Sequence, residues 1–304
     1  MRAIDARTGR DVWTVDLEEI GGWSVVAGPV LAGDLVVVAL DSGHLLAVEQ
    51  ATGLDRWSWS SQTYSISDIV AVDDRVYVTT RTGDGVAVVA LDGSGGTQRW
   101  RTDLGDVDGA FSAQVSATPS AVLVGVEGTD RAVMFGVATD GRLGWELDLG
   151  DTHLTGRPAI DGATAVLATQ DDDAVVSIIG LPVATGEETW RWTRRPETGT
   201  TYQTPVRALA VSGEWVYAAG PELLLLDRAT GEVSGTLPGY SAVPFVVGDE
   251  LVGCPVRAAL GRTADTRTVH MSDEDGDAVS CYDLVTVANG AYYAVDDGDL
   301  RALG

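Results

Sequence analysis

The chain has 304 residues, and its 45 acidic and 20 basic side chains give it a formal net charge of -25. This charge argues against nucleic-acid or anionic-membrane partners, because both reward clusters of Lys and Arg. No apolar run reaches the length of about 18 residues that a membrane-spanning helix needs, so we expect no membrane insertion.

A short pattern recurs along the chain at a nearly constant interval. It consists of a strand-forming run, a Thr-Gly turn and a second run that bears Trp, as from Ala47 to Trp57. The Gly of the turn recurs at Gly9, Gly53, Gly96, Gly141, Gly186 and Gly231. A period of roughly 40–50 residues built from short strands is typical of a β-propeller with one four-stranded blade per repeat.

The Trp of the pattern occupies the same position in five copies, four residues after the Gly. These residues are Trp13, Trp57, Trp100, Trp145 and Trp190. Because they share one structural position, we predict that they pack between blades and do not form a ligand platform. The sixth copy keeps the turn but has Gly235 in the Trp position.

The first complete repeat predicts strands over 25–31, 35–40, 44–48 and 55–59, since short Val- and Leu-rich runs are separated there by Gly, Asp and Ser. Later blades are expected over 65–103, 110–149, 155–193 and 204–236. Beyond Gly231 the pattern weakens. There we predict strands over 243–247 and 250–255, a third over 267–271 and a short fourth over 278–282.

The two ends of the chain complement one another. Residues 285–304 align with the first three strands of the first complete repeat, and residues 1–17 supply a Thr-Gly turn and a strand with Trp13. We therefore predict one all-β domain, 1–304, a β-propeller of four-stranded antiparallel blades whose closing blade combines 1–17 with 283–304. Seven blades fit best, and six or eight are the alternatives. Segments 2–5 and 301–303 compete for the third strand of the closing blade.

The N-terminus has no charged leader followed by an apolar core, so the sequence as given predicts no export. Because the chain starts within a repeat, a longer precursor or a preceding domain is the alternative, and the compartment stays open.

The pattern Ala-x-Asp-x-x-Thr-Gly-x-x-x-Trp from Ala3 to Trp13, with its degenerate copies, resembles the pyrroloquinoline-quinone-type repeat of quinoprotein β-propellers. The resemblance extends over essentially the whole chain. It implies a propeller whose outer-strand Trp side chains pack between blades. The family includes cofactor-dependent alcohol and sugar dehydrogenases. It also includes non-enzymatic scaffolds, among them a lipoprotein of the outer-membrane barrel assembly machinery and repeat domains of bacterial kinases.

The enzymatic branch is marked by residues that this chain lacks. Many alcohol-oxidising members have an adjacent Cys pair against the quinone, and a calcium ion held by Glu and Asn beside a catalytic Asp. Here no two Cys are adjacent, and the single Asn, Asn289, lies in a predicted turn. We therefore expect no cofactor and no catalytic residue, and predict a monomeric, non-catalytic binding or scaffold protein with a protein partner. The alternative is a quinoprotein-type dehydrogenase, or a sensor for a small ligand or metal, that uses the central channel.

A basic cluster is the strongest candidate for partner binding. Its members are Arg191, Trp192, Arg194 and Arg195. Guanidinium groups beside an aromatic ring could dock a carboxylate- or phosphate-bearing partner. The alternative is that these Arg side chains pair with nearby acidic turns.

The remaining candidates have simpler explanations. Cys254 and Cys281 could form one disulfide across an irregular segment, or be two small buried side chains, and neither has metal-binding spacing. The acidic runs 171–173 and 273–277 do not match a calcium-binding loop, so we expect solvated turns. We expect His44, His153 and His270 to be turn or core residues.

Overall fold

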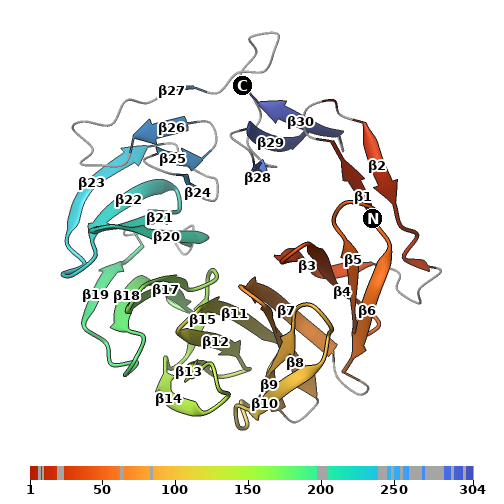
Figure 1. The fold of residues 1–304 in the computed structure, drawn as a ribbon. Helices are drawn as coiled ribbons and strands as arrows, with labels where there is room; N and C mark the ends of the chain where they lie inside the picture. The colour runs from red at the N-terminus through yellow and green to blue at the C-terminus, as the bar shows by residue number, and fades with distance from the viewer. Residues whose placement is uncertain are drawn as a thin grey trace. The chain divides into compact units, whose positions relative to one another are not determined.

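The structure is a computed structural model. It describes residues 1–5, 8, 10–18, 24–61, 65–82, 85–196 and 205–238, followed by the strand segments 245–247, 250–253, 256–259, 269–270, 284–288, 291–296 and 299–303. All helices and strands that the structure defines in this described part are β-strands, and the sheets are built from antiparallel pairs (Figure 1). The chain divides into two compact units, one formed by Met1–Thr152 with Val183–Gly186 and the other by His153–Pro182 with Glu187–Gly304.

The first unit contains three four-stranded sheets whose strands follow chain order. They are β3 (Val25–Ala32), β4 (Leu35–Leu40), β5 (His44–Glu49) and β6 (Asp55–Ser60); β7 (Ser65–Val72), β8 (Arg75–Thr82), β9 (Gly85–Asp92) and β10 (Gln98–Asp103); and β11 (Ser112–Thr118), β12 (Ala121–Glu127), β13 (Ala132–Val137) and β14 (Leu143–Asp148). A two-stranded sheet pairs β1 (Arg2–Ile4) with β2 (Asp11–Thr14). These bounds agree closely with the strands predicted from the repeat.

The next two sheets keep the predicted blade positions. They are β15 (Thr152–Leu154), β16 (Ala159–Asp161), β17 (Thr164–Asp171), β18 (Val176–Pro182) and β19 (Trp190–Arg194); and β20 (Ala208–Ser212), β21 (Trp215–Ala219), β22 (Glu222–Asp227) and β23 (Val233–Pro238). The first strand of the former blade is split into β15 and β16. Pro158, which has no backbone N–H to donate, lies directly before β16.

Beyond β23 one sequence prediction was wrong. The sheet there consists of β24 (Phe245–Val247), β25 (Glu250–Gly253), β26 (Val256–Ala259) and β27 (Val269–His270). Its third strand therefore lies at 256–259, where we predicted irregular chain, and the segment predicted as third strand provides the fourth. The fourth strand predicted at 278–282 lies outside the described residues.

Both segments that competed for the closing blade are strands. β1 is the hydrogen-bonded neighbour of β2, with Ala3 opposite Trp13. Residues 301–303 belong to β30 (Asp299–Leu303), which pairs with β29 (Ala291–Asp296), itself paired with β28 (Leu284–Ala288). The seven-blade count and the closing blade remain predictions.

The core of the first unit is a set of layers between adjacent sheets. Every residue of β12 and β13 is buried, whereas β14, the outermost strand of that sheet, alternates between exposed and half-buried positions at its end. Tyr77 and Val88 of one sheet belong to the same apolar cluster as Val124 and Phe135 of the next. Middle strands are thus covered on both faces by neighbouring sheets, which explains their Val- and Leu-rich composition.

Candidate functional site

The five repeated Trp side chains each contact the Gly-containing turn that lies one repeat further along the chain. In every case the indole Nε1–H donates a hydrogen bond to a backbone carbonyl of that turn or next to it. The pairs are Trp13 with Gln50 (2.9 Å), Trp57 with Gly93 (2.9 Å), Trp100 with Thr139 (3.0 Å), Trp145 with Val183 (2.7 Å) and Trp190 with Arg228 (2.8 Å). The polar edge of each indole is satisfied by the fold, as expected for a Trp placed between elements.

The Gly of each turn lies directly against the ring of the preceding Trp. Gly186, for example, has a φ of 68° and lies so close to Trp145 that an added Cβ would overlap the ring. Gly53 and Gly96 contact Trp13 and Trp57 in the same way. Glycine is therefore required at this position for two reasons. It adopts the positive φ without strain, and it leaves room for the close approach of the indole.

One sheet reverses the sizes of the residues in this arrangement. Trp145 lies opposite Gly136 on the neighbouring strand, and Trp190 lies opposite Gly180. In the β20–β23 sheet the outer-strand residue is Gly235, and the buried Leu225 lies opposite it. This sheet has its large residue on the third strand, and its outer strand β23 has no indole.

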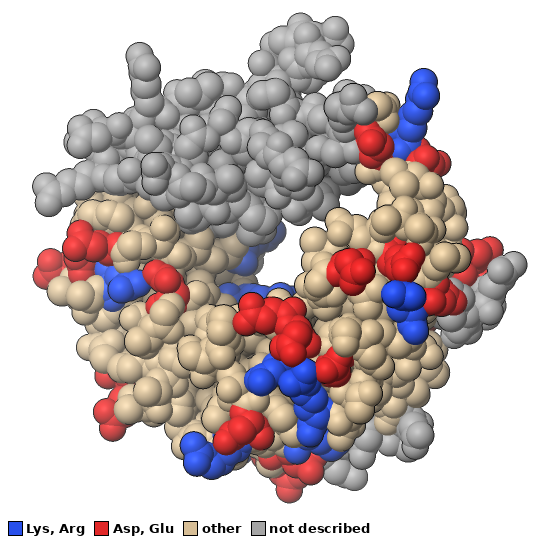
Figure 2. Space-filling view, viewed as in Figure 1, with Lys and Arg blue, Asp and Glu red and all other residues tan. Residues whose placement is uncertain are grey.

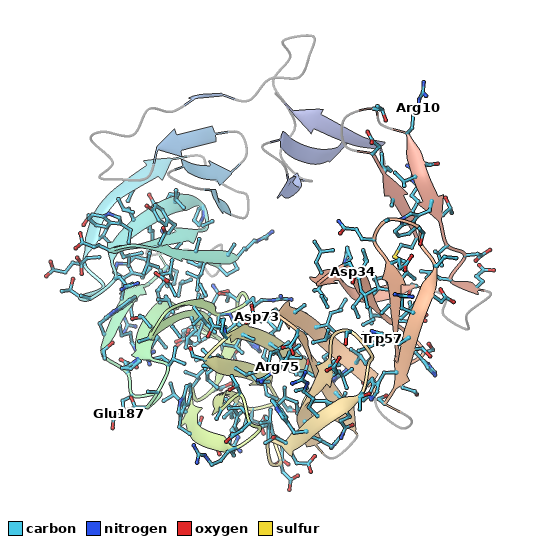
Figure 3. All side chains as sticks on the ribbon, viewed as in Figure 1. Arg10, Asp34, Trp57, Asp73, Arg75 and Glu187 are labelled. Carbon is cyan, nitrogen blue, oxygen red and sulfur yellow. The ribbon has the colours of Figure 1, made fainter. Side chains whose placement is uncertain are left out.

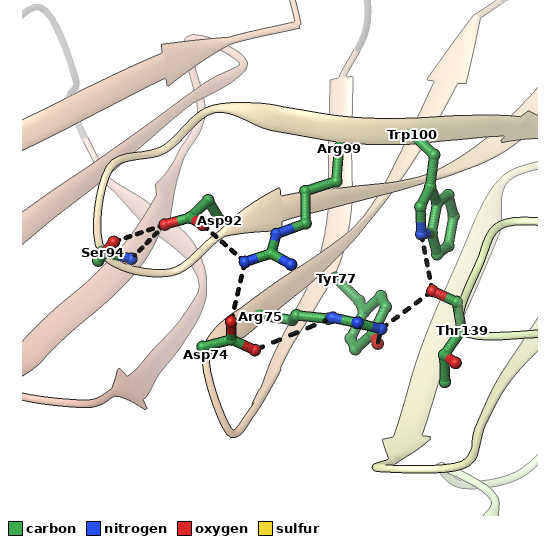
Figure 4. Close-up of polar contacts among 8 residues, drawn as sticks. All are labelled: Asp74, Arg75, Tyr77, Asp92, Ser94, Arg99, Trp100 and Thr139. Carbon is green, nitrogen blue, oxygen red and sulfur yellow. Dashed lines mark hydrogen bonds and ion pairs between the residues drawn. The ribbon is translucent and has the colours of Figure 1, made fainter.

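A network of charges supports one junction in the first unit (Figure 4). Arg99 contacts Asp74 at 2.8 Å and Asp92 at 2.7 Å. Arg75 donates to the carbonyl of Thr139 at 3.0 Å, the same carbonyl that accepts the Trp100 indole N–H. A half-buried ring and a charged side chain therefore converge on one carbonyl of the next sheet.

The environment of Asp92 favours its ionised form. Hydrogen bonds from Ser94, and then the guanidinium of Arg99, lower the pKa of Asp92 to about 2. The same Asp92 hydrogen bond is the main reason that the pKa of Arg99 is raised. The carboxylate of Asp92 therefore holds the turn between β9 and β10 at any ordinary pH.

The second unit has a corresponding junction. Arg228, whose carbonyl accepts the Trp190 indole N–H, also pairs through its side chain with Asp161 at 2.7 Å. In the same turn, hydrogen bonds from the backbone N–H and hydroxyl of Thr230 lower the pKa of Asp227. The sequence analysis missed both charge networks, because their partners lie far apart along the chain. The acidic residues four positions before Gly96 and Gly231 were the available signal.

The basic cluster is largely engaged within the fold. Arg191 contacts both carboxylate oxygens of Glu188, the closer one at 2.6 Å. Arg194 pairs with Glu222 at 2.9 Å, and its guanidinium lies 5.8 Å from the ring centre of the half-buried Trp192. Arg195 is exposed and makes no hydrogen bond or ion pair with any described residue. Of the four candidates, Arg195 and the edge of Trp192 therefore stay accessible to a partner.

The other candidates are spread over the molecule. The ring Nδ1 of His44 lies 3.1 Å from the Ser42 hydroxyl within a turn, and His153 contacts Asp172 at 3.7 Å on the surface. Within the described part of the chain, no three His, Cys, Asp or Glu side chains are placed to hold a metal ion. Cys254, Cys281 and the run 273–277 lie outside the described residues, as does the side chain of His270.

Charged side chains are distributed over several sheets of the face in view (Figure 2). Asp73 and Arg75 lie near one another at the β7–β8 hairpin, while Arg10 points away from the strands (Figure 3). None of the helical structure in the described residues is long and apolar enough to cross a membrane.

Comparisons with known proteins agree with this architecture. A family model described as outer membrane protein assembly factor BamB matches residues 1–236. No curated protein matches the chain significantly. The crystal structure of BamB from Moraxella catarrhalis is similar with a TM-score of 0.64 and 20% identity, over 97% of this chain and 86% of that one.

Two dehydrogenase structures are similar as well. The quinohemoprotein alcohol dehydrogenase ADHIIG from Pseudomonas putida HK5 has a TM-score of 0.57 and 13% identity, over 92% of this chain and 55% of its own. A europium-containing methanol dehydrogenase has a TM-score of 0.53 and 15% identity, over 70% of this chain and 50% of its own. The present chain thus spans about half the length of these enzymes.

The β-propeller fold predicted from the repeat is confirmed. Since the family model covers most of the sequence, the chain belongs to the family described as outer membrane protein assembly factor BamB.

Proposed function

We propose that this protein is a non-catalytic scaffold whose blades form a rigid frame and whose loops bind a protein partner. The observation that supports this most directly is the series of five equivalent Trp–Gly junctions, each closed by a hydrogen bond to a backbone carbonyl. Repeated locking of this kind fixes the sheets and leaves the loops to determine specificity. Membership of the BamB family favours the same role.

The basic cluster offers one contact for an acidic partner. Arg195 is exposed and directly follows β19, the strand that carries the half-buried Trp192. Arg191 and Arg194 of that strand are held in place by Glu188 and Glu222. Preorganised guanidinium groups beside an aromatic ring are typical of residues that dominate binding energy. We expect Arg195→Glu to weaken such a contact and Arg56→Glu, at another exposed Arg, to leave it unchanged.

A quinoprotein-type dehydrogenase is the second candidate, because two similar structures belong to such enzymes. The donor set that this activity needs does not fit the described residues, where no three carboxylate, imidazole or thiol groups converge. The sequence also lacks an adjacent Cys pair. We therefore derive no catalytic step for this chain.

Two measurements test the scaffold role. The purified protein is incubated with calcium and pyrroloquinoline quinone, and its melting temperature and its reduction of an artificial electron-accepting dye are recorded. A ligand that binds only the folded state at 100 times its Kd would stabilise it by about 2.7 kcal/mol. We expect neither a higher melting temperature nor dye reduction. Quinone-dependent reduction with an alcohol or sugar would refute the proposal.

A further experiment looks for the protein partner directly. It places a photo-cross-linking amino acid at position 195 in the cells that make the protein. A scaffold should give one discrete cross-linked protein from this position. The same cross-linker at position 56 is the matched control. A cross-linking pattern that is the same from both positions would contradict a specific contact at the basic cluster.

A further inference from the structure

The loop between β10 and β11 has an unusual combination of features. It covers residues 104–111, here called the Phe111 loop, and connects the second and third sheets of the first unit. Leu104 and Val107 are buried and belong to the apolar cluster between these two sheets. The loop is therefore anchored in the core at two points.

Hydrogen bonds hold the Phe111 loop along its length. Its carbonyl groups at Asp106, Asp108 and Ala110 accept from Arg131 (3.3 Å), the Thr129 N–H (2.9 Å) and Arg81 (2.9 Å). The backbone N–H of Phe111 donates to Glu127 at 2.9 Å. Loops with buried anchors and satisfied backbone groups open rarely, so this one presents its side chains in a fixed arrangement.

The fixed loop and the turn next to it carry an exposed aromatic ring and several unpaired carboxylates. Phe111 is 51% exposed. Asp106 and Asp108 of the loop, and Asp130 of the adjacent β12–β13 turn, are exposed and form no hydrogen bond or ion pair through their carboxylates with any described residue. This is in contrast to Asp103 and Asp148 nearby, which pair with Arg101 and Arg131.

The apolar character continues along the same end of the first unit. β7 lies between β3 and β11. The ends of β3 and β7 lie near one another, since Gly93 lies against both Ala32 and Asp74, and β7 and β11 begin near one another, since Arg81 beside the start of β7 bonds to Ala110. Val25 and Val26 at the start of β3 are 39% and 46% exposed. Exposed apolar residues on a rigid frame with an acidic rim are typical of protein-binding surfaces.

We propose that the Phe111 loop is a docking site for a basic polypeptide segment, one that places an apolar side chain on Phe111 and Arg or Lys side chains on Asp106, Asp108 and Asp130. This inference rests on the scaffold role proposed above and names the chemistry of one partner. The charge supports a basic occupant, because three unpaired carboxylates lie on the Phe111 loop and on the turn that is hydrogen-bonded to it. An Arg of the partner can pair with a carboxylate and also stack on the Phe111 face.

The test uses a fluorescently labelled synthetic peptide of alternating Leu and Arg, with a Ser/Arg peptide and a Leu/Glu peptide as controls. Binding to the full chain is measured by fluorescence anisotropy between about 0.1 M and about 1 M salt, where screening removes most surface electrostatics. We expect Leu/Arg to bind most tightly, Ser/Arg to bind weakly and only at low salt, and Leu/Glu not to bind.

Matched variants separate the docking site from general attraction to an acidic protein. Phe111→Ser should weaken Leu/Arg binding by about tenfold or more, as expected for loss of an aromatic anchor. Leu54→Ser, at a 64% exposed residue in the β5–β6 turn at the other end of the blades, should change it by less than about twofold. The double variant Asp106→Asn/Asp108→Asn should weaken Leu/Arg binding more than the double variant Asp34→Asn/Asp55→Asn. The second variant removes the same number of charges outside the Phe111 loop.

Equal effects of the matched variants would overturn the docking site, as would equal binding of the Leu/Arg and Ser/Arg peptides or absence of binding. Thermal unfolding of each variant verifies that it is folded. These outcomes concern only the Phe111 loop, whereas quinone-dependent dye reduction would refute the scaffold role whatever the peptides do.

Discussion

The β11–β14 sheet and the β20–β23 sheet solve the same packing problem in opposite ways. In the first, the outer strand provides Trp145 and the neighbouring strand provides Gly136. In the second, the outer strand provides Gly235 and the neighbouring strand provides Leu225. Both pairs combine one large and one small side chain, but only the outer-strand Trp also donates a hydrogen bond at a Gly turn one repeat further along the chain.

The difference separates two functions of the repeated Trp. Filling its own sheet can be done from either strand, as Leu225 shows. Joining the next sheet needs both the indole N–H and a Gly turn to receive the ring, as with Trp100, Thr139 and Gly141. We therefore expect substitutions at Trp positions to affect stability more than substitutions at the equivalent position of the β20–β23 sheet.

The largest expected effect is that of Trp145→Ala. The substitution removes the ring that covers Gly186 and leaves the Val183 carbonyl without its donor. Large-to-small changes of this kind cost about 3–5 kcal/mol in the free energy of unfolding. Denaturant unfolding measures it, and Gly235→Ala is the matched control, with an expected change below about 1 kcal/mol. Similar losses for the two variants would contradict a special role of the Trp.

A smaller effect is expected for Gly186→Ala. The new methyl group would meet both an unfavourable positive φ and the Trp145 ring. Gly33→Ala is the matched control, because Gly33 has a φ of 64° but no atom within 4 Å of an added Cβ. We expect about 1 kcal/mol for Gly33→Ala from backbone strain alone, and about 1–3 kcal/mol more for Gly186→Ala. If thermal and denaturant unfolding give the same loss for both, the close Trp contact is unimportant.

The reversed sizes at positions 225 and 235 can be tested by exchanging the large and the small residue. Gly235→Trp alone should destabilise by about 1–3 kcal/mol, because Leu225 already occupies the space. Combining it with Leu225→Gly should recover part of this loss, with a coupling energy of about 0.5–3 kcal/mol in a double-mutant cycle. Strict additivity of the two substitutions would show that positions 225 and 235 do not share one packing site.

The sequence was sufficient to predict the blades up to β23, because both the turn Gly and the Trp act locally and recur with a regular period. Beyond Gly235 the Trp is absent, and only apolar runs are left as a signal for strands. The third strand of the next sheet was therefore predicted at 267–271, whereas the structure has it at 256–259, as β26. Short strands of this kind differ little in composition from the chain around them.

The candidate sites were harder to predict, since their partners are distant in sequence. Arg194 was identified as a candidate, but Glu222 and its role as partner were not. The Phe111 loop has no motif, and its exposure depends on the anchors Leu104 and Val107 and on Arg81 and Arg131 from other strands. Only the folded chain brings these groups together.

The smallest effect concerns the turns that both kinds of sheet share. Asp92 lies four residues before Gly96 and Asp227 four residues before Gly231, and in each turn Ser or Thr donates to the carboxylate. The folded-state pKa of Asp92 is lowered to about 2, so its stabilisation is complete above the unfolded pKa of about 3.9 and is lost as the pH falls toward 2. Asp92→Asn should therefore reduce the free energy of unfolding at neutral pH and flatten its decrease between about pH 4 and pH 2, the acid limb of the stability curve.

Asp227→Asn should change the same acid limb in the same direction, since the pKa of Asp227 is lowered by the same kind of hydrogen bonds from Thr230. Urea unfolding as a function of pH measures both variants, and Asp55→Asn, in an exposed carboxylate outside these turns, is the control. An acid limb that is unchanged by Asp92→Asn would show that the turn, with or without its Trp partner, does not depend on the carboxylate.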